Sequence, residues 1–256
     1  MTGALAATYG PRPAPFILGI GIAGVGLLLS VVFVRDTGEF VAEEVRLHEE
    51  VVDARGLGEA FVQTTVRDPS LSAICQAGLV NNLNDALVWG LMPIFLAREG
   101  LSIGRIGVVA AVYAGSWGLA QLATGAWSDA VGRKPLIVGG LAVQAAGIAA
   151  LVVAVSYAGW LLAALVMGLG TALVYPTLIA AVSDHVHPTW RASAVGVYRL
   201  WRDLGYAVGG LLVGVVADVV SIDAAIIVVA AITASSALVV ATRLREAPRV
   251  PQIRTE

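Results

Sequence analysis

Seven long apolar stretches dominate this sequence and leave few ways in which it can fold. Cut at prolines, glycines and charge clusters, they cover approximately residues 15–34, 71–97, 104–126, 135–155, 159–183, 192–217 and 222–242. A helix of about 20 apolar residues crosses the hydrocarbon core of a bilayer, so each stretch is long enough to span. The strands of a membrane barrel would show strict alternation of apolar and polar residues. The sequence lacks this pattern, and we therefore expect seven transmembrane helices.

Composition excludes the main soluble classes of protein. Apolar residues make up 58% of the chain and charged residues 13%, whereas a soluble domain has about 45–50% and about 25%. A soluble enzyme, a nucleic-acid-binding domain and a disordered chain are therefore excluded. With a formal net charge of -2, nucleic acid is not an expected partner and the lipid bilayer is. Cys75 is the single cysteine, and we expect no cofactor and no metal site.

Basic residues in the connections predict the side of the membrane that each connection occupies. Successive connections lie on alternating sides of the membrane. Those on one side, together with the C-terminal tail, hold eleven basic residues: Arg35, Arg46, Arg55, Arg67, Arg133, Lys134, Arg191, Arg243, Arg245, Arg249 and Arg254. The opposite set holds Arg12, Arg98 and Arg105. Because cytoplasmic loops carry the excess of Lys and Arg, we expect a multi-pass protein of the cell (inner) membrane with a cytoplasmic C-terminus.

A motif connects the third and fourth stretches. It reads Gly125-Ala126-Trp127-Ser128-Asp129-Ala130-Val131-Gly132-Arg133-Lys134 and resembles the G-x-x-x-D-x-x-G-R-K loop of the major facilitator superfamily. Gly125 would let a neighbouring helix approach closely, and Gly132 can adopt a positive φ at the turn. Asp129 lies at ion-pair spacing from Arg133. The resemblance implies that this loop holds helices together in one conformational state and does not bind substrate.

Other segments are similar to bacterial members of the same family. Residues 71–97 resemble their seventh helix, 170–177 their tenth, 198–206 their eleventh, and 5–13 the connection between their fifth and sixth. The resemblance implies the C-terminal portion of such a protein, with the first five helices absent. The chain would be either a truncated reading frame or a half that pairs with another polypeptide.

The expected fold class is therefore all-α, a polytopic membrane protein with seven transmembrane helices. Six of them would form a C-terminal half of 3+3 inverted repeats, and Gly125-x-x-x-Asp129 indeed recurs as Gly214-x-x-x-Asp218. The expected parts are an N-terminus with the first helix, a cytoplasmic central loop, a six-helix domain and a cytoplasmic tail, at residues 1–34, 35–70, 71–245 and 246–256.

Ionisable side chains inside spans cost about 2.5–3.5 kcal/mol each on insertion scales, so they are functional candidates. Four such residues lie inside the predicted spans: Asp85, Arg199, Arg202 and Asp203. Polar and amphipathic side chains complete a candidate path for substrate and protons: Gln76, Asn81, Asn82, Trp89, Tyr113, Trp117, Tyr175 and Tyr206.

Asp85 lies about 14 residues into its span, or about 20 Å along the helix axis, which places it near the midplane. Three roles remain open for it. It could load and release a proton as the cavity opens to each side, pair permanently with Arg199 or Arg202, or contact the substrate directly.

Asp184 and Arg191 flank a connection that the topology places on the same side as the motif. We expect Asp129, Arg133, Asp184 and Arg191 to form a four-member ion cluster that latches one conformational state, with Lys134 holding the loop at the cytoplasmic surface.

The expected function is secondary active transport of a small organic solute, coupled to protons. An enzyme is not expected, because the chain has no H-E-x-x-H motif and no phosphate-binding loop. A non-transporting half-protein that scaffolds or regulates another membrane protein is the alternative, and a membrane-embedded enzyme is the least favoured. Expected partners are lipid, an unidentified solute and the missing N-terminal half.

Overall fold

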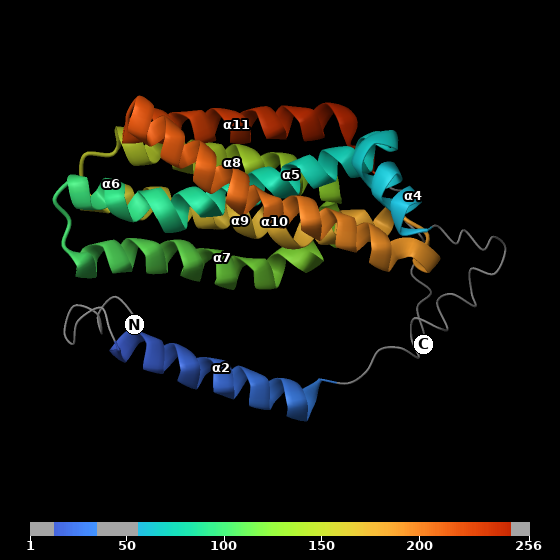
Figure 1. The fold of residues 1–256 in the computed structure, drawn as a ribbon, viewed down its shortest axis with the longest axis horizontal. Helices are drawn as coiled ribbons and strands as arrows, with labels where there is room; N and C mark the ends of the chain where they lie inside the picture. Colours follow the sequence, from blue (N-terminus) through green and yellow to red (C-terminus); the bar gives the residue numbers. More distant parts are fainter. Residues whose placement is uncertain (1–12, 35–55, 247–256) are drawn as a thin grey trace.

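The computed structural model describes residues 13–34 and 56–246, and every secondary-structure element in these ranges is helical (Figure 1). The elements are α2 (Ala14–Phe33), α4 (Leu57–Val62), η1 (Gln63–Arg67), α5 (Pro69–Ala86), η2 (Leu87–Leu91), α6 (Met92–Arg98), α7 (Ile103–Val131), α8 (Arg133–Val153), α9 (Tyr157–Asp184), α10 (Pro188–Val219) and α11 (Ile222–Arg243). Here η marks a π-helix. The predicted all-α class is confirmed.

Six of the described helices are long and apolar enough to cross a membrane, namely α2, α7, α8, α9, α10 and α11. The predicted span 71–97 forms one uninterrupted helical segment of α5, η2 and α6. It is not among the six, because α5 buries a run of polar residues that includes Asn84 and Asp85. The count of seven crossings therefore stays a prediction.

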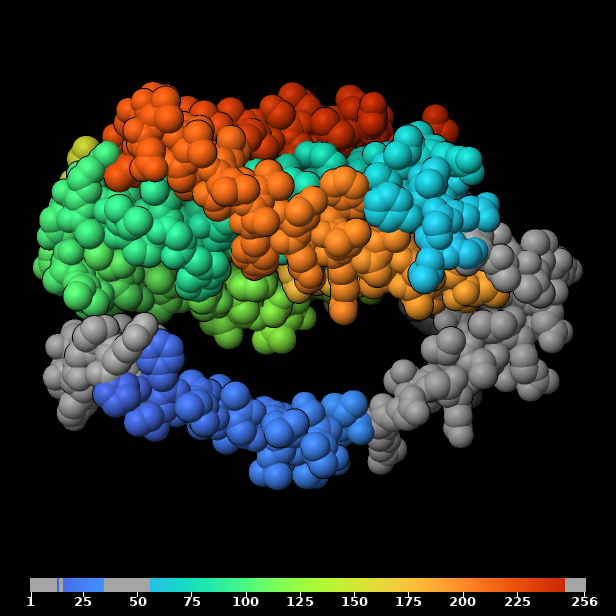
Figure 2. Space-filling view, in the orientation of Figure 1, coloured from blue at the N-terminus to red at the C-terminus, as the bar shows by residue number. Residues whose placement is uncertain are grey.

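Helix α2 stands apart from the other helices (Figures 1 and 2). None of its described side chains is buried, and Val31 is 75% exposed. An apolar surface of this size on a 20-residue helix needs lipid or another protein around it.

The remaining long helices form one bundle (Figure 1). Helix α8 packs against α9 and α11. Helix α10 packs against α5, and helix α7 packs against α9. An inverted repeat that exchanges α5, α7 and α8 with α9, α10 and α11 would map the α5–α10 contact onto the α9–α7 contact. The observed pairing supports the predicted repeat.

Glycines let the parallel helices α5 and α10 touch along their backbones. A Cβ atom at Gly205 would lie 2.1 Å from the carbonyl oxygen of Leu79, and one at Gly209 would lie 2.8 Å from the Cα of Leu83. Membrane helices associate through such small residues because lipid supplies no hydrophobic force between them. This contact places α10 beside the polar stretch of α5.

Two apolar cores occupy the two ends of the bundle. One surrounds Met92, Tyr113 and Met167, and the other surrounds Leu71, Leu141 and Trp190. Between them lies a layer of buried polar side chains that we call the polar layer: Asn81, Asn82, Asn84, Asp85, Gln144, Thr171 and Thr233. Buried polar groups need hydrogen-bond partners, so this layer is where functional geometry is expected.

Part of the predicted central loop is helical and packed. Helices α4 and η1 run over residues 57–67, and Ala60 and Thr64 are fully buried. Trp201 of α10 donates from its indole nitrogen to the hydroxyl of Thr65 at 3.0 Å. The predicted N-terminus before residue 13, residues 35–55 of the central loop and the tail after residue 246 lie outside the described residues.

Candidate functional site

Asp85 is buried in the polar layer, with 1% of its surface exposed. Its carboxylate accepts hydrogen bonds on both oxygens. Tyr113 of α7 donates to Oδ1, and Tyr206 of α10 donates to Oδ2 at 3.2 Å. Two hydroxyl donors suit an ionised carboxylate, which can only accept. Three helices therefore converge on this one side chain.

The helix that carries Asp85 changes form immediately after it. The π-helix η2 begins at Leu87, and Pro93 follows in the first turn of α6. Proline has no N–H to donate to the preceding turn, and single-turn π segments are frequent at functional sites. Trp89 lies in η2, is half exposed, and makes an edge contact with the ring of Tyr113 at 5.9 Å between ring centroids.

Four of the five aromatic side chains predicted from the sequence contact one another in succession, and we call them the aromatic row: Trp89, Tyr113, Trp117 and Tyr175. Ring centroids are 6.3 Å apart between Tyr113 and Trp117, and 5.6 Å apart between Trp117 and Tyr175. Arg202 closes the row, since its guanidinium lies 5.5 Å from the ring of Tyr175 and donates to the Tyr175 hydroxyl at 3.0 Å.

Arg202 forms its ion pair with Asp203 at 2.7 Å, and not with Asp85. The structure therefore contradicts a permanent pair between Asp85 and Arg202. Arg199 is exposed on α10, and within residues 56–246 Asp203 pairs with Arg202 and not with Arg199. The reason is that Tyr175 holds the Arg202 side chain in place through its ring and its hydroxyl.

Gln144 and three further residues of the polar layer were missed by sequence reasoning. Gln144 of α8 donates to the Thr171 hydroxyl of α9 at 2.6 Å and to Asn81 Oδ1 at 3.3 Å. It accepts from Asn84 at 2.8 Å, and Thr233 of α11 donates to Asn84 at 2.7 Å. The Thr171 hydroxyl lies 3.2 Å from that of Tyr113. A lone amide in the apolar stretch 135–155 was the signal that could have identified Gln144.

The amide residues of α5 have different surroundings. Gln76 accepts a hydrogen bond from Ser236 of α11 at 3.2 Å, which is a contact between helices. Asn81 contacts Gln144, as described above, and Asn82 is buried beside Gly205 of α10. Within the described part of the chain, Asn82 Oδ1 has no hydrogen-bond partner.

The motif loop forms an ion-paired cluster centred on Arg133. The guanidinium contacts Asp129 at 2.6 Å and Asp184 at 2.8 Å, and it also donates to the Ser128 hydroxyl. Gly132 adopts φ of +110° at the turn between α7 and α8. Arg191 lies in the first turn of α10, and its membership of the cluster stays a prediction.

Gly125 does not bring a neighbouring helix close, contrary to the expectation from the motif. Among the described residues, nothing lies within 4 Å of a Cβ atom built at Gly125. The reason is that Gly125 lies on an exposed face of α7, next to Trp127, which is 53% exposed. Any helix that approaches this face must come from outside the described bundle.

The segment after α11 is attached to the motif loop, which the sequence did not indicate. The carboxylate of Glu246 accepts from the backbone amides of Arg133 at 3.3 Å and Lys134 at 2.7 Å. The carbonyl oxygen of Arg245 lies 2.8 Å from Nε2 of His185, and the backbone amide of Arg245 donates to the Ser70 hydroxyl at 3.1 Å. Residues 244–246 thus tie the ends of several helices together, and we call them the C-terminal strap.

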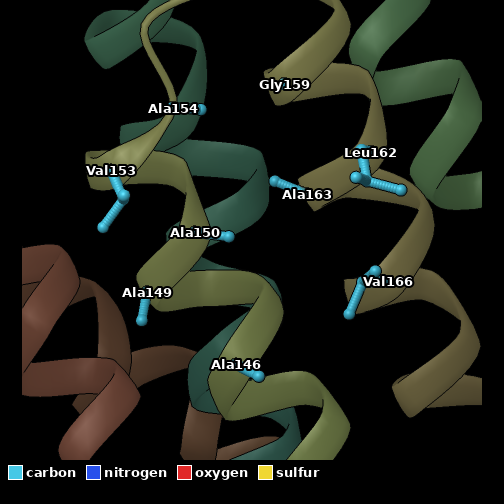
Figure 3. Close-up of a pocket in the computed structure, with 9 residues that line it drawn as sticks. All are labelled: Ala146, Ala149, Ala150, Val153, Ala154, Gly159, Leu162, Ala163 and Val166. Carbon is cyan, nitrogen blue, oxygen red and sulfur yellow. The ribbon is translucent and has the colours of Figure 1, made fainter.

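The grooves on the outer surface lie away from these residues. One of about 580 Å³ runs between α8 and α9 and is lined by apolar side chains such as Ala150, Leu162 and Val166 (Figure 3). None of the predicted site residues lines it. Within the described ranges no three His, Cys, Asp or Glu side chains are grouped so that they could hold a metal ion.

Comparison with known proteins agrees with this geometry. The family model of the Major Facilitator Superfamily matches residues 74–256. The chain is 25% identical over 205 residues to the uncharacterised MFS-type transporter YddS of Bacillus subtilis, covering 79% of this chain and 47% of YddS. It is 32% identical over 125 residues to the multidrug resistance protein MdtH of Aeromonas salmonicida, covering 46% and 30% of the two chains.

A third relative is the inner membrane transport protein YnfM of Escherichia coli, at 26% identity over 146 residues, which cover 57% of this chain and 35% of YnfM. The chain spans less than half the length of each of these three relatives. The family model covers more than half of this chain, and the helical bundle and the motif loop fit it. The chain belongs to the major facilitator superfamily.

Proposed function

We propose that this chain forms the C-terminal half of a secondary active transporter of the inner membrane, and that Asp85 carries the coupled proton. The observation that carries the proposal is the surroundings of Asp85. A buried carboxyl group accepts two tyrosine hydroxyl bonds from two other helices and has no ion-pair partner among the described residues.

Such a carboxyl group can exist in two forms with different demands. An ionised carboxylate in the hydrocarbon region is costly, and here the hydroxyls of Tyr113 and Tyr206 offset part of that cost. A protonated carboxyl needs no charge compensation and tolerates a dry surrounding. Alternating access would expose the group to water on each side in turn, so that a proton bound on one side is released on the other.

The aromatic row and the nearby Tyr206 support a small organic solute as the cargo. Trp89 is 50% exposed and contacts Tyr113, which donates to Asp85. Tyr206 is 45% exposed and donates to Asp85 directly. Aromatic faces bind apolar and cationic parts of a solute, while hydroxyl groups bind polar parts. Relatives named as multidrug resistance proteins are in agreement with an organic solute.

The proposal requires an N-terminal half, on the same polypeptide or on another. Rocking of two halves around a central site is the mode of transport in this type of fold. The exposed faces of α2 and α7, with Gly125 open and Val31 exposed, are surfaces that another bundle would cover. We propose a C-terminus in the cytoplasm, with the motif cluster and the C-terminal strap on the same side.

The test is solute uptake by everted membrane vesicles that contain this chain together with an N-terminal half, energised with a pH gradient and screened with labelled organic amines, carboxylates and sugars. The account predicts gradient-driven uptake of at least one solute, which the Asp85→Asn substitution abolishes and Thr177→Val leaves intact. Thr177 is a buried hydroxyl on α9 that bonds to the backbone of Leu173. Equal uptake by the Asp85→Asn variant would refute the proton-carrying role.

The alternative function is a scaffold for another membrane protein, and the observation that favours it is the exposed apolar surface of α2, on which another membrane protein could pack. Co-purification with a membrane protein that is not a facilitator half, without any gradient-driven uptake, would support the scaffold over the transporter.

A further inference from the structure

The hydroxyl of Tyr113 lies between two groups that compete for its single proton. On one side it donates to Asp85 Oδ1, and on the other it lies 3.2 Å from the Thr171 hydroxyl, in a contact where either oxygen can be the donor. All three side chains are buried, with exposed fractions of 1% or less. Water is therefore not at hand to replace a bond that one of them loses.

Resting on the proton-carrying role of Asp85, we propose that Thr171, held in place by Gln144, is a positioning residue that reverses the Tyr113 hydrogen bond when Asp85 is protonated. The Tyr113 proton never leaves its oxygen. The hydroxyl rotates, and one proton passes between water and Asp85.

When Asp85 is ionised, every group in the series of hydrogen bonds from Asp85 to Gln144 has a partner. Tyr113 donates to Asp85 and accepts from Thr171, whose oxygen accepts from Gln144 Nε2 at 2.6 Å. A threonine hydroxyl has one proton and two lone pairs, so this arrangement is within its capacity.

The protonated state is satisfied too, because Thr171 has a second acceptor for its proton. The carboxyl O–H donates to Tyr113, and Tyr113 turns to donate to Thr171. Thr171 then directs its own proton to the carbonyl oxygen of Met167, which lies 3.1 Å away in the preceding turn. Gln144 still donates to the same oxygen, so both lone pairs of the threonine hydroxyl are used.

Other groups around Asp85 do not offer this exchange. Tyr206 of α10 donates to Oδ2 and is 45% exposed, so water can satisfy its hydroxyl in either state. Arg202 of the same helix is committed to Asp203 and Tyr175. On α5 itself, Asn84 is bonded to Gln144 and Thr233. The reversal therefore runs through Thr171 and reports the protonation of Asp85 to α8 and α9.

The test is a pH titration of the purified full chain in lipid nanodiscs. The readout is the infrared carbonyl band of a protonated carboxyl group. The band that Asp85→Asn removes is assigned to Asp85. Thr171→Val keeps the shape of the side chain and removes the acceptor that the protonated state needs. The midpoint pH of the band is expected to fall by about one unit, because a buried donor loses its partner.

Three further variants separate a relay from general packing effects. Thr171→Ser restores the hydroxyl and is expected to restore the wild-type midpoint, and Thr177→Val is expected to leave it unchanged. Tyr113→Phe removes a donor to the ionised form, so the midpoint is expected to rise by about one unit. In that background Thr171→Val is expected to have no further effect, which is the coupling that a double-mutant cycle measures.

An unchanged midpoint in Thr171→Val, or equal shifts in Thr171→Val and Thr177→Val, would overturn the relay while leaving Asp85 as the proton carrier. A shift in Tyr206→Phe without one in Thr171→Val would place the proton on Oδ2 and would also overturn it. The absence of any titrating band that Asp85→Asn removes would refute the proton-carrying role, and the relay with it. If Thr171→Val does not fold, Thr171→Ala removes the same acceptor, and an unchanged midpoint in that variant would overturn the relay.

Discussion

The carboxylate of Glu246 accepts a hydrogen bond from the backbone amide of Lys134 at 2.7 Å, which joins the end of the described chain to the first turn of α8. Unpaired amides and the positive end of the helix dipole make this turn a favourable place for a carboxylate. The contact ties the C-terminal strap to the loop whose motif the sequence identifies, although 112 positions separate the two residues.

Removal of this carboxylate is predicted to loosen the strap. Glu246→Ala takes away a helix cap, which costs about 1 kcal/mol of stability. We expect faster hydrogen exchange at the amides of Arg133 and Lys134 and a lower melting temperature in detergent. The matched control is Glu99→Ala, since Glu99 forms an exposed pair with Arg98 after α6, and exposed pairs contribute about 0–1 kcal/mol. Equal effects of the two variants would refute the capping role.

Gly132 is predicted to tolerate no side chain. Its φ of +110° lies in a region that L-residues rarely adopt, and a Cβ atom would lie 2.8 Å from Oε1 of Glu246. Gly132→Ala is expected to destabilise the fold by about 1–3 kcal/mol and to free the strap. Gly139→Ala, in the following helix α8, has nothing within 4 Å of its Cβ atom, so it serves as the control and is expected to cost nothing. Thermal melts of both variants would check this, and similar melting temperatures would contradict it.

The α5–α10 contact is predicted to be the most sensitive glycine interface. Gly205→Ala forces the two backbones apart, because a Cβ atom would lie 2.1 Å from the Leu79 carbonyl. We expect a loss of about 1–3 kcal/mol or more, together with a longer distance from Tyr206 to Asp85. Gly210→Ala on the outer side of α10 has nothing within 4 Å and should be neutral. The check is the melting temperature of each variant, and a neutral Gly205→Ala would show that the helices are not in backbone contact.

The aromatic row is predicted to bind the transported solute. We expect Trp117→Phe to weaken solute binding several-fold while preserving the fold, because the edge contact with Tyr175 is weakened. Trp127→Phe is the control, since Trp127 is 53% exposed on the outer face of α7. Fluorescence quenching of the remaining tryptophans by the solute found in the vesicle screen measures this. Identical affinities would exclude the row from the binding site.

Local sequence spacing predicts the parts of this molecule that depend on one helix. The pair of Asp129 and Arg133 is four residues apart, and the polar face of Asp85 follows from helical periodicity, so both could be anticipated. The basic residues in the connections predicted that Asp184 and Arg133 lie on the same side of the membrane. The ion pair between them at 2.8 Å agrees with this prediction.

Contacts between distant helices could not be predicted in the same way. The choice of Asp203 as the partner of Arg202, and of tyrosines as the partners of Asp85, depends on how helices rotate against each other. No helix of the described bundle approaches Gly125 closely, contrary to the expectation, because spacing on α7 does not show which face is covered. Gln144 was missed because an amide has no signature until its neighbours are known.

The central claim is that Asp85 binds and releases the coupled proton, and proton counting tests it most directly. The purified chain in lightly buffered detergent is mixed with the solute from the vesicle screen, while an indicator dye records the pH. The account predicts that solute binding changes the bound protons by about one per protein in the wild type and by none in Asp85→Asn. An equal proton change in the two proteins would contradict it.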